Sequence, residues 1–230
     1  MSTNSRPVII AIDGPSGAGK STLGRLVARE LGLLYIDTGA MYRAVALAVT
    51  RAGVSTTDES AVAEVARRSE VDLAGDPDSL QVRLDGEDVS EEIRSEQITH
   101  TASVISALPA VRRELVRRQR EMGAPGGIVL DGRDIGTVVF PNADVKFFLT
   151  AVPEERAKRR FDEERRERGD QTYEDTLADI NARDRRDSTR ADSPLAIAAD
   201  AVVIDTTELP IEDVFQRMIE TIRERRRELS

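Results

Sequence analysis

Five short apolar runs recur along the chain, and each has the length of a β-strand. They are VIIAID at 8–13, LLYID at 33–37, GIVLD at 127–131, VKFFLTA at 145–151 and AVVID at 201–205. Runs of this kind are typical of strands that are buried on both faces of a parallel sheet. Apolar residues at helical spacing follow the strands, as between Lys20 and Leu31, where Gly32 ends the predicted helix. The pattern predicts an α/β fold, a five-stranded parallel sheet with helices on both faces.

The stretch 68–94 interrupts this alternation. Leu80, Val82 and Leu84 occupy every second position before the turn DGED. This alternation predicts short antiparallel strands with one face exposed to solvent. Helices are predicted near 57–69 and near 91–107. We therefore expect 38–106 to be an inserted small α+β domain packed over the edge of the sheet. The core would then consist of 1–37 and 107–230.

The segment 153–190 is rich in charge of both signs and predicts a solvated pair of helices. Pro153 suits the first turn of the first helix, and Gly169 is expected to end it. Thr172 and Asp175 predict a cap for the second helix. The arginines near 112–120 are interpreted mostly as a solvated helix face.

Composition excludes several classes of protein. The 230 residues include no cysteine, which excludes a disulfide framework, a zinc–thiolate site and a thiol nucleophile. A net charge of −9 argues against general binding of nucleic acid. The sequence shows no secretory leader and no membrane-length apolar run. We expect a cytoplasmic monomer without a membrane or nucleic-acid partner, and no role for the single histidine, His100.

A phosphate-binding loop follows the first predicted strand. The segment Gly14, Pro15, Ser16, Gly17, Ala18, Gly19, Lys20 and Ser21, followed by Thr22, fits the pattern G-x-x-x-x-G-K-[ST]. Glycines let backbone N–H groups point inward, and the helix start adds positive potential. Lys20 can reach the β- and γ-phosphates, and the Ser21 hydroxyl can ligate Mg²⁺. The loop therefore predicts binding of ATP with Mg²⁺.

The rest of the sequence narrows the class of nucleotide-binding protein. No N-K-x-D segment for reading guanine is present, and the strand GIVLD ends in the single carboxylate Asp131, which could hold Mg²⁺. Three segments at or near strand ends offer arginine beside hydroxyl or carboxylate: IDTGAMYR at 36–43, LDGRDIGTVVFP at 130–141 and RDRRDSTR at 183–190. That mixture suits an acceptor with an anionic group, a sugar and a planar polar ring. It favours a small kinase.

Together with the phosphate loop, these segments resemble the bacterial cytidylate kinases over nearly the whole chain. The resemblance implies a P-loop kinase core, a monophosphate-binding insertion and a short helical lid within about 153–190. It also implies transfer of the γ-phosphoryl of ATP to CMP or dCMP with Mg²⁺. Carried over by position, it assigns the acceptor phosphate to Arg43 and Arg133, the cytosine to Thr38, Arg112, Asp134 and Arg190, and the ribose to Ser103, Arg183 and Asp187. The lid arginines Arg156 and Arg159 or Arg160 would meet the transferring phosphoryl group.

Two other functions remain open on the sequence alone. A kinase for an alcohol would need a base near Asp37, whereas a nucleotide-binding regulator would bind ATP without turnover. A monophosphate acceptor needs no base, because its second pKa is about 6 and its oxygen is already an anion at neutral pH.

Overall fold

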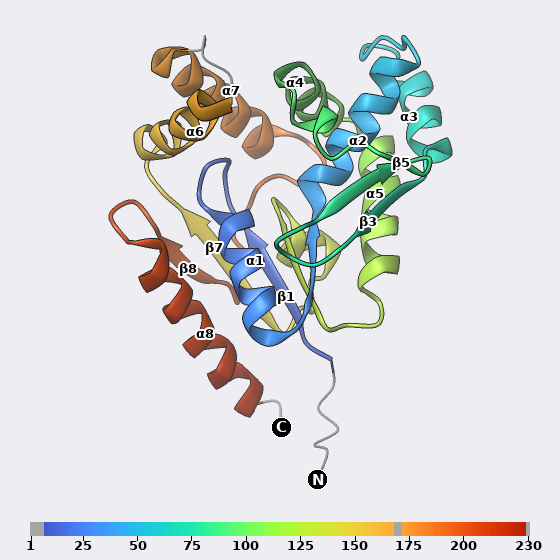
Figure 1. The fold of residues 1–230 in the computed structure, drawn as a ribbon. Coiled ribbons are helices and arrows are strands. Elements are labelled where there is room, and N and C mark those ends of the chain that lie inside the picture. Colours follow the sequence, from blue (N-terminus) through green and yellow to red (C-terminus); the bar gives the residue numbers. More distant parts are fainter. Residues whose placement is uncertain (1–6, 168–171, 229–230) are drawn as a thin grey trace.

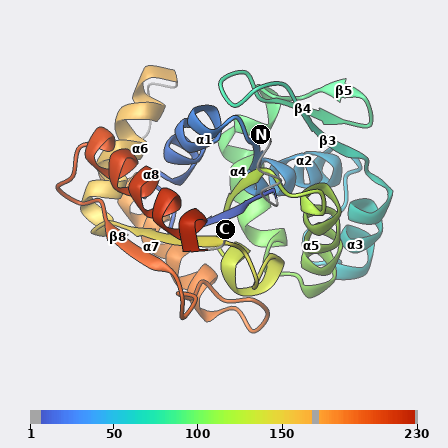
Figure 2. The ribbon, with the colours of Figure 1, turned by 90° about the horizontal axis from the view of Figure 1, so that it is seen from below.

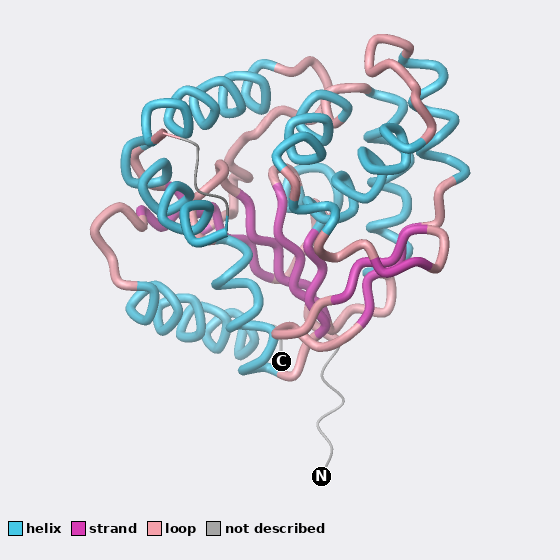
Figure 3. Tube along the Cα trace, turned by 45° about the horizontal axis from the view of Figure 1, so that its top comes forward, coloured by secondary structure: helices cyan, strands magenta, loops and turns pink. Residues whose placement is uncertain are grey.

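The computed structural model describes residues 7–167 and 172–228, and it confirms the parallel sheet. The strands are β1 (Ile9–Asp13), β2 (Leu34–Asp37), β6 (Ile128–Gly132), β7 (Val145–Thr150) and β8 (Val202–Asp205). They lie in the order β2-β6-β1-β7-β8 and pair in parallel throughout. Each observed strand matches its predicted range to within a residue at either end. Figure 3 shows this sheet at the centre, with helices around it.

Both faces of the sheet are covered, as the continuous apolar runs predict. On β1, Ile10 and Ile12 belong to one hydrophobic cluster and Ala11 belongs to the other. Helices α1 (Lys20–Leu31) and α8 (Ile211–Glu228) cover the face of Ile10 and Ile12, and they lie side by side in Figures 1 and 2. Helices α2 (Thr38–Arg51) and α5 (Pro109–Gly123) cover the face of Ala11.

The antiparallel strands expected within 68–94 are present. They are β3 (Val71–Ala74), β4 (Gln81–Leu84) and β5 (Glu87–Asp88), and they form a separate three-stranded sheet. Helix α3 (Glu59–Arg68) precedes them, and a 3₁₀ turn, η1 (Glu92–Arg94), and α4 (Glu96–Ile105) follow. Val62, Val82 and Ile98 from this segment share one cluster with Leu115 and Leu130. The inserted segment therefore packs on the same core as the main sheet.

The connection after β6 contains less helix than the helical pattern expected after each strand. It is a single five-residue π-helical turn, η2 (Ile135–Val139), and the chain then enters β7. Residues 133 and 134 thus lie between the end of a buried strand and a short turn. Within the described ranges, no helix is long and apolar enough to cross a membrane.

Helices α6 (Pro153–Glu167) and α7 (Tyr173–Thr189) form the charged pair. Pro153 begins α6 as expected, whereas Gly169 lies outside the described residues. Thr172 and Asp175 form the predicted capping box: the Thr172 hydroxyl accepts from the Asp175 N–H, and the Asp175 carboxylate accepts from the Thr172 N–H. In Figure 1 the two helices stand beyond the carboxyl ends of the strands, opposite α2 and α4.

Replacing Thr172 with alanine removes this cap and is expected to lower the free energy of unfolding by about 1 kcal/mol. For a chain of this length the melting temperature should fall by about 2–4 °C. Thr221→Ala on α8 is the matched control, because that exposed hydroxyl donates only to the carbonyl of Arg217 within the helix. Equal melting temperatures for the two variants would contradict the cap. Thermal unfolding followed by circular dichroism measures both.

Candidate active site

Three chain segments meet where the central strands end. Asp13 at the end of β1 is paired in register with Gly132 on β6, and Asp37 at the end of β2 is paired with Asp131. The phosphate loop, the start of α2 and the segment after β6 therefore share one edge of the sheet. Ligands of open α/β sheets bind at the carboxyl ends of the strands.

The phosphate loop has the backbone geometry that its glycines predict. Gly14, Gly17 and Gly19 all have positive φ, at 146°, 77° and 86°. A Cβ on Gly14 would lie 2.0 Å from the carbonyl oxygen of Leu149, and one on Gly17 would lie 2.9 Å from backbone and Cβ atoms of Arg156. Gly19 is the N-cap residue of α1 and has a left-handed backbone conformation, so no side chain caps the first N–H groups of this helix. The first N–H groups of α1 are thus directed at the space enclosed by the loop.

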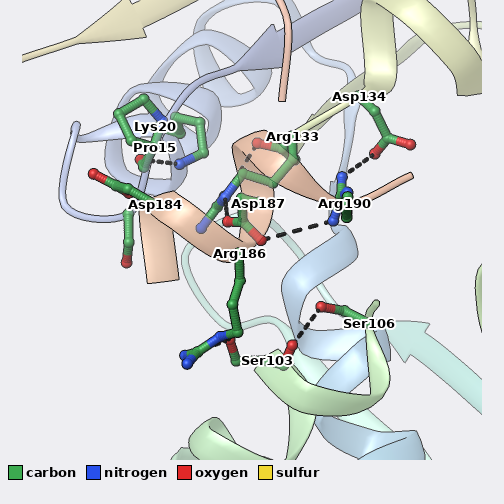
Figure 4. A network of polar contacts seen from close by, with 12 residues as sticks. Pro15, Lys20, Ser103, Ser106, Arg133, Asp134, Asp184, Arg186, Asp187 and Arg190 are labelled. Carbon is green, nitrogen blue, oxygen red and sulfur yellow. Dashed lines mark hydrogen bonds and ion pairs between the residues drawn. The ribbon is translucent and has the colours of Figure 1, made fainter. Parts of the chain in front are cut away.

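Lys20 and Asp131 form the charged centre of the loop. Lys20 is buried, and its ammonium donates to the carbonyl of Pro15 at 2.7 Å (Figure 4). Burial and the nearby Arg133 guanidinium lower the pKa of Lys20 to about 7. Burial, and then the Asp37 carboxylate, raise the pKa of Asp131 to about 6. The two groups oppose each other's shifts, because each favours the charged form of its neighbour.

The side chains of Ser21 and Asp131 fit a magnesium ion held largely by a nucleotide. The Ser21 hydroxyl donates to Oδ2 of Asp131 at 2.8 Å, and the Tyr35 hydroxyl donates to Oδ1 at 2.9 Å. Hydroxyl and carboxylate oxygens are ligands that Mg²⁺ prefers. Among the described residues, no cluster of three His, Cys, Asp or Glu side chains could hold a metal by itself. This donor set matches an ion that takes its other ligands from phosphate and water.

A cavity of about 1100 Å³ opens in front of the loop and extends toward the inserted segment. It is lined by the loop residues Ser16–Thr22 and by seven arginines: Arg25, Arg43, Arg94, Arg133, Arg159, Arg160 and Arg183. In the part of the chain that the structure describes, the buried Nε atoms of Arg43 and Arg183 have no hydrogen-bond partner. Burial and the neighbouring Arg133 guanidinium lower the pKa of Arg183 to about 9. So dense a group of cations is suited to bind an anion of high charge.

Arg43 and Arg133, the residues expected at the acceptor phosphate, are each held by a carboxylate. Arg43 donates to Asp37 at 3.0 Å, and Arg133 donates from Nε to Asp187 at 2.9 Å. Asp37 also caps α2 by accepting from the N–H of Ala40. Burial would raise the pKa of Asp37, but Arg43 and this backbone bond lower it below its usual value. Asp37 is therefore a weak base.

The residues expected around the cytosine lie together. The carboxylate of Asp134 contacts Arg112 and lies 3.9 Å from Arg190, as Figure 4 shows for Arg190. Thr38 is buried, and its hydroxyl donates to the carbonyl of Asp131 at 2.7 Å. The Tyr42 ring lies under the Arg112 guanidinium, 5.9 Å from ring centroid to Cζ. The cluster presents both donors and an acceptor to a planar polar ring.

Ser103 and Asp187, two of the residues expected at the ribose, contact other arginines. The Ser103 hydroxyl accepts from Nη2 of Arg186 at 3.1 Å, which joins α4 to α7. Asp187 also lies 3.7 Å from Arg190. Arg183, the third of this group, lines the large cavity together with Arg133. Ser103 and Asp187 both lie in the polar network drawn in Figure 4.

The arginines expected in the lid occupy different positions. Arg156 is buried and donates to the carbonyls of Ala151 and Ser16, and it pairs with Asp184 at 2.6 Å. Arg159 donates from Nη1 to the Thr206 hydroxyl at 3.0 Å. Arg160 lines the large cavity and also a smaller one, of about 420 Å³, between α4 and α7. Arg156 thus contacts the outside of the phosphate loop, whereas Arg159 and Arg160 border the cavity.

Sequence reasoning missed several side chains at this site. Tyr35 holds Asp131, Tyr42 supports Arg112, and Arg186 holds Ser103. Tyr35 and Tyr42 lie inside quoted motifs, and a tyrosine next to a site carboxylate or arginine is a usable signal. Arg118 is a correction, since it is not part of a solvated face: it donates to the carbonyls of Ala66 and Ser69 at the end of α3.

Comparison with known proteins identifies the family. The model of the cytidylate kinase family matches residues 10–224. A cytidylate kinase of Geobacter sp. (strain M21) is 51% identical over 218 residues, which cover 95% of this chain and 94% of that protein. A cytidylate kinase of Bacillus subtilis (strain 168) is 46% identical over 218 residues, with 95% and 97% covered.

Among solved structures, an uncharacterized protein from Eubacterium ventriosum has a similar fold, with a TM-score of 0.51 at 11% identity. That alignment covers 94% of this chain and 98% of that one. The family match spans the phosphate loop, the segment after β6 and the arginines of α7, which are the parts that form the site. The chain belongs to the cytidylate kinase family and is a nucleoside monophosphate kinase.

Proposed function

We propose that this chain transfers the γ-phosphoryl group of ATP to CMP and dCMP in the presence of Mg²⁺. The observation that carries the proposal is one continuous cavity that joins the phosphate loop to Arg43 and Arg133. Asp187 connects this cavity to the cluster of Asp134, Arg112 and Arg190, because it pairs with Arg133 and lies 3.7 Å from Arg190. The chain also belongs to the cytidylate kinase family. A triphosphate in the loop and a monophosphate on the arginines would face each other across the cavity.

The triphosphate would be held by residues 14–22, with Lys20 on its outer phosphates. Ser21 and Asp131 would hold Mg²⁺, which neutralises phosphate charge when it is bound. The adenine would lie against the segment after β8, where Leu209, Pro210 and Ile211 line the same cavity. Leu209 and Ile211 are large apolar side chains exposed to solvent, and an aromatic base would cover them.

On the acceptor side, Arg43 and Arg133 would bind the phosphate, and Ser103, Arg183 and Asp187 would contact the sugar. Asp134 would accept from the exocyclic amine of cytosine, while Thr38, Arg112 and Arg190 complete the ring's surroundings. Uracil carries an oxygen where cytosine carries the amine. Two acceptors would then face each other, which costs about 1–3 kcal/mol and favours cytosine by roughly tenfold to a hundredfold.

The proposed reaction uses alignment and charge neutralisation and needs no general base. The acceptor phosphate is already an anion at neutral pH. Asp37, the base that an alcohol kinase would need, is ion-paired with Arg43 and has a lowered pKa. Arg156 and Arg159 are proposed to act on the phosphoryl group after exchanging their present backbone partners. Arg159 and Arg160 both border the cavity already.

The same proposal divides the chain by role. Residues 1–37 and 107–230 would form the kinase core, with the lid within 153–190, and 38–106 would be the monophosphate-binding insertion.

A coupled assay of ADP release tests the function with CMP, dCMP, UMP, AMP and shikimate as acceptors. CMP and dCMP should give kcat/KM values at least tenfold above that of UMP. Turnover no higher than that of the sample with ATP alone would refute the proposal.

A further inference from the structure

Asp13 is a buried carboxylate to which the proposed function assigns no role. It ends β1 and is only 4% exposed, and its side chain contacts the segment after β6. Its two oxygens accept from the N–H groups of Ile135, at 2.8 Å, and Gly136, at 2.7 Å. These are the first two N–H groups of the η2 turn. Asp13 therefore caps a helical turn that lies more than a hundred residues later in the chain.

The residue that would ordinarily make such a cap is Asp134. It occupies the N-cap position of η2, where an aspartate usually accepts from its own helix's N–H groups. Within the described residues, the side chain of Asp134 makes no cap hydrogen bond. Its carboxylate instead contacts Arg112 and Arg190. Asp13 therefore caps the start of η2 in place of Asp134.

We propose that Asp13 is a positioning residue for acceptor specificity: by capping η2 from β1, it leaves the carboxylate of Asp134 free to read the acceptor base. This inference rests on the proposed function, since it concerns selection between cytosine and uracil. Without the cap, two N–H groups of η2 would lack a partner in a buried place. Asp134 could satisfy one of them by turning back onto its own turn, which would withdraw its carboxylate from Arg112 and Arg190.

The charge state of Asp13 is consistent with its role as the acceptor of both N–H groups. The pKa of Asp13 is raised to about 6, because burial, together with a smaller effect of the Asp134 carboxylate, outweighs the bonds from Gly136 and Ile135, which lower it. Lys20 also lowers it. Asp13 is thus ionised at neutral pH and can accept two backbone N–H groups at once. An uncharged amide of the same shape has only one acceptor oxygen.

The test is the variant Asp13→Asn, assayed with CMP and UMP at saturating ATP. The introduced side chain has one acceptor oxygen and one NH₂ group. The NH₂ group would face one of the two backbone N–H groups, so that two donors would meet. We expect the CMP-to-UMP ratio of kcat/KM to fall about tenfold and the KM for ATP to stay within twofold. Asp144→Asn is the matched control, because that carboxylate also accepts from a backbone N–H, at Ile9, but at the opposite end of β1. The control should lower the melting temperature without changing the ratio.

A double-mutant cycle separates positioning from general damage. Asp134→Asn alone should lower the CMP-to-UMP ratio tenfold to a hundredfold. If Asp13 acts through Asp134, adding Asp13→Asn to that variant changes the ratio less than twofold. Effects that multiply, or a normal ratio in Asp13→Asn, overturn the inference. Turnover of CMP by the wild-type enzyme tests the proposed function separately.

Should Asp13→Asn fail to fold, the wild-type protein supplies the measurement. The amide signals of Ile135 and Gly136 are expected to shift together with the side-chain carboxyl signal of Asp13 as the pH falls from 7 to 5. Among the described residues, Lys20 and Asp134 lie close enough to Asp13 to shift its pKa, and their own signals are followed as references. Amide signals that do not follow the carboxyl of Asp13 overturn the cap.

Discussion

Lys20→Met is expected to lower kcat by about 10²- to 10³-fold while the fold is retained. Methionine keeps most of the length of the side chain but removes the charge that would meet the outer phosphates of ATP. Charge on those phosphates is redistributed in the transition state, so the loss should appear in kcat more than in the KM for ATP. Steady-state assays with CMP measure both constants.

The chain offers a closely matched control in Lys146. Both lysines are 6% exposed, and both donate to the carbonyl of a proline five residues earlier: Lys20 to Pro15 and Lys146 to Pro141. Lys146 also pairs with Asp200, away from the phosphate loop. Lys146→Met should lower the melting temperature and leave kcat within a factor of about two. A similar loss of kcat in both variants would show that removing any buried lysine impairs the enzyme.

The lowered pKa of Lys20 adds a pH dependence with a definite sign. Burial, followed by the nearby Arg133, lowers the pKa from 10.5 to about 7 in the folded protein. Between these values the unfolded chain binds more protons, so the lysine's penalty on stability is full below pH 7 and fades as the pH rises toward 10.5. Lys20→Met should therefore melt at a higher temperature than the wild type at pH 6, and this difference should shrink by pH 9.

ATP binding should also take up a proton at Lys20. A triphosphate favours the charged lysine, so ATP affinity should fall as the pH rises from 7 to 9, and this slope should disappear in Lys20→Met. Titration calorimetry in buffers of different ionisation enthalpy measures the uptake directly. An unchanged slope in the variant would assign the proton to another group.

The sequence predicted best where one local stretch determines the geometry. The phosphate loop could be located because glycine at Gly14, Gly17 and Gly19 permits positive φ and a close backbone approach. The strand ranges followed from continuous apolar runs, since burial on both faces leaves no polar alternation. Such signals lie within a few neighbouring residues and require no knowledge of the tertiary contacts.

Prediction was poorest where a side chain's partner is distant in the sequence. Asp13 bonds to Ile135, and Arg156 bonds to Ser16, over separations of 122 and 140 residues. The spacing of residues along the chain carries no sign of these contacts. Arg118 is another residue whose partners are distant in the sequence. Its neighbours on α5 indicate a solvated face, but it packs against α3 and donates to carbonyls at the end of that helix.

The Arg133–Asp187 pair should be a larger determinant of acceptor binding than any other ion pair of the site. Arg133→Met is expected to lower kcat/KM for CMP by about 10²- to 10³-fold. The substitution removes a cation from the acceptor phosphate and also leaves Asp187, a buried carboxylate, beside that phosphate with one partner fewer. The KM for ATP should stay within about threefold, because the loop that holds the triphosphate keeps its own contacts.

Arg133→Lys distinguishes charge from geometry. A lysine restores the positive charge but lacks the planar fork that can bind Asp187 and a phosphate at the same time. We therefore expect kcat/KM for CMP to lie between those of the wild type and Arg133→Met. Recovery to the wild-type value would mean that charge alone is sufficient at this position.

The control is the Arg118–Glu114 pair, whose side chains are 14% and 14% exposed, against 16% and 6% for Arg133 and Asp187. Arg118→Met also breaks a largely buried ion pair and removes bonds to three backbone carbonyls, yet it lies outside the cavity. It should lower the melting temperature and leave kcat/KM for CMP unchanged. If Arg133→Met stays within threefold of the wild type, Arg133 does not hold the acceptor phosphate. The phosphate would then be bound by Arg43 and Arg183, whose Nε atoms are buried at the same cavity and have no hydrogen-bond partner among the described residues.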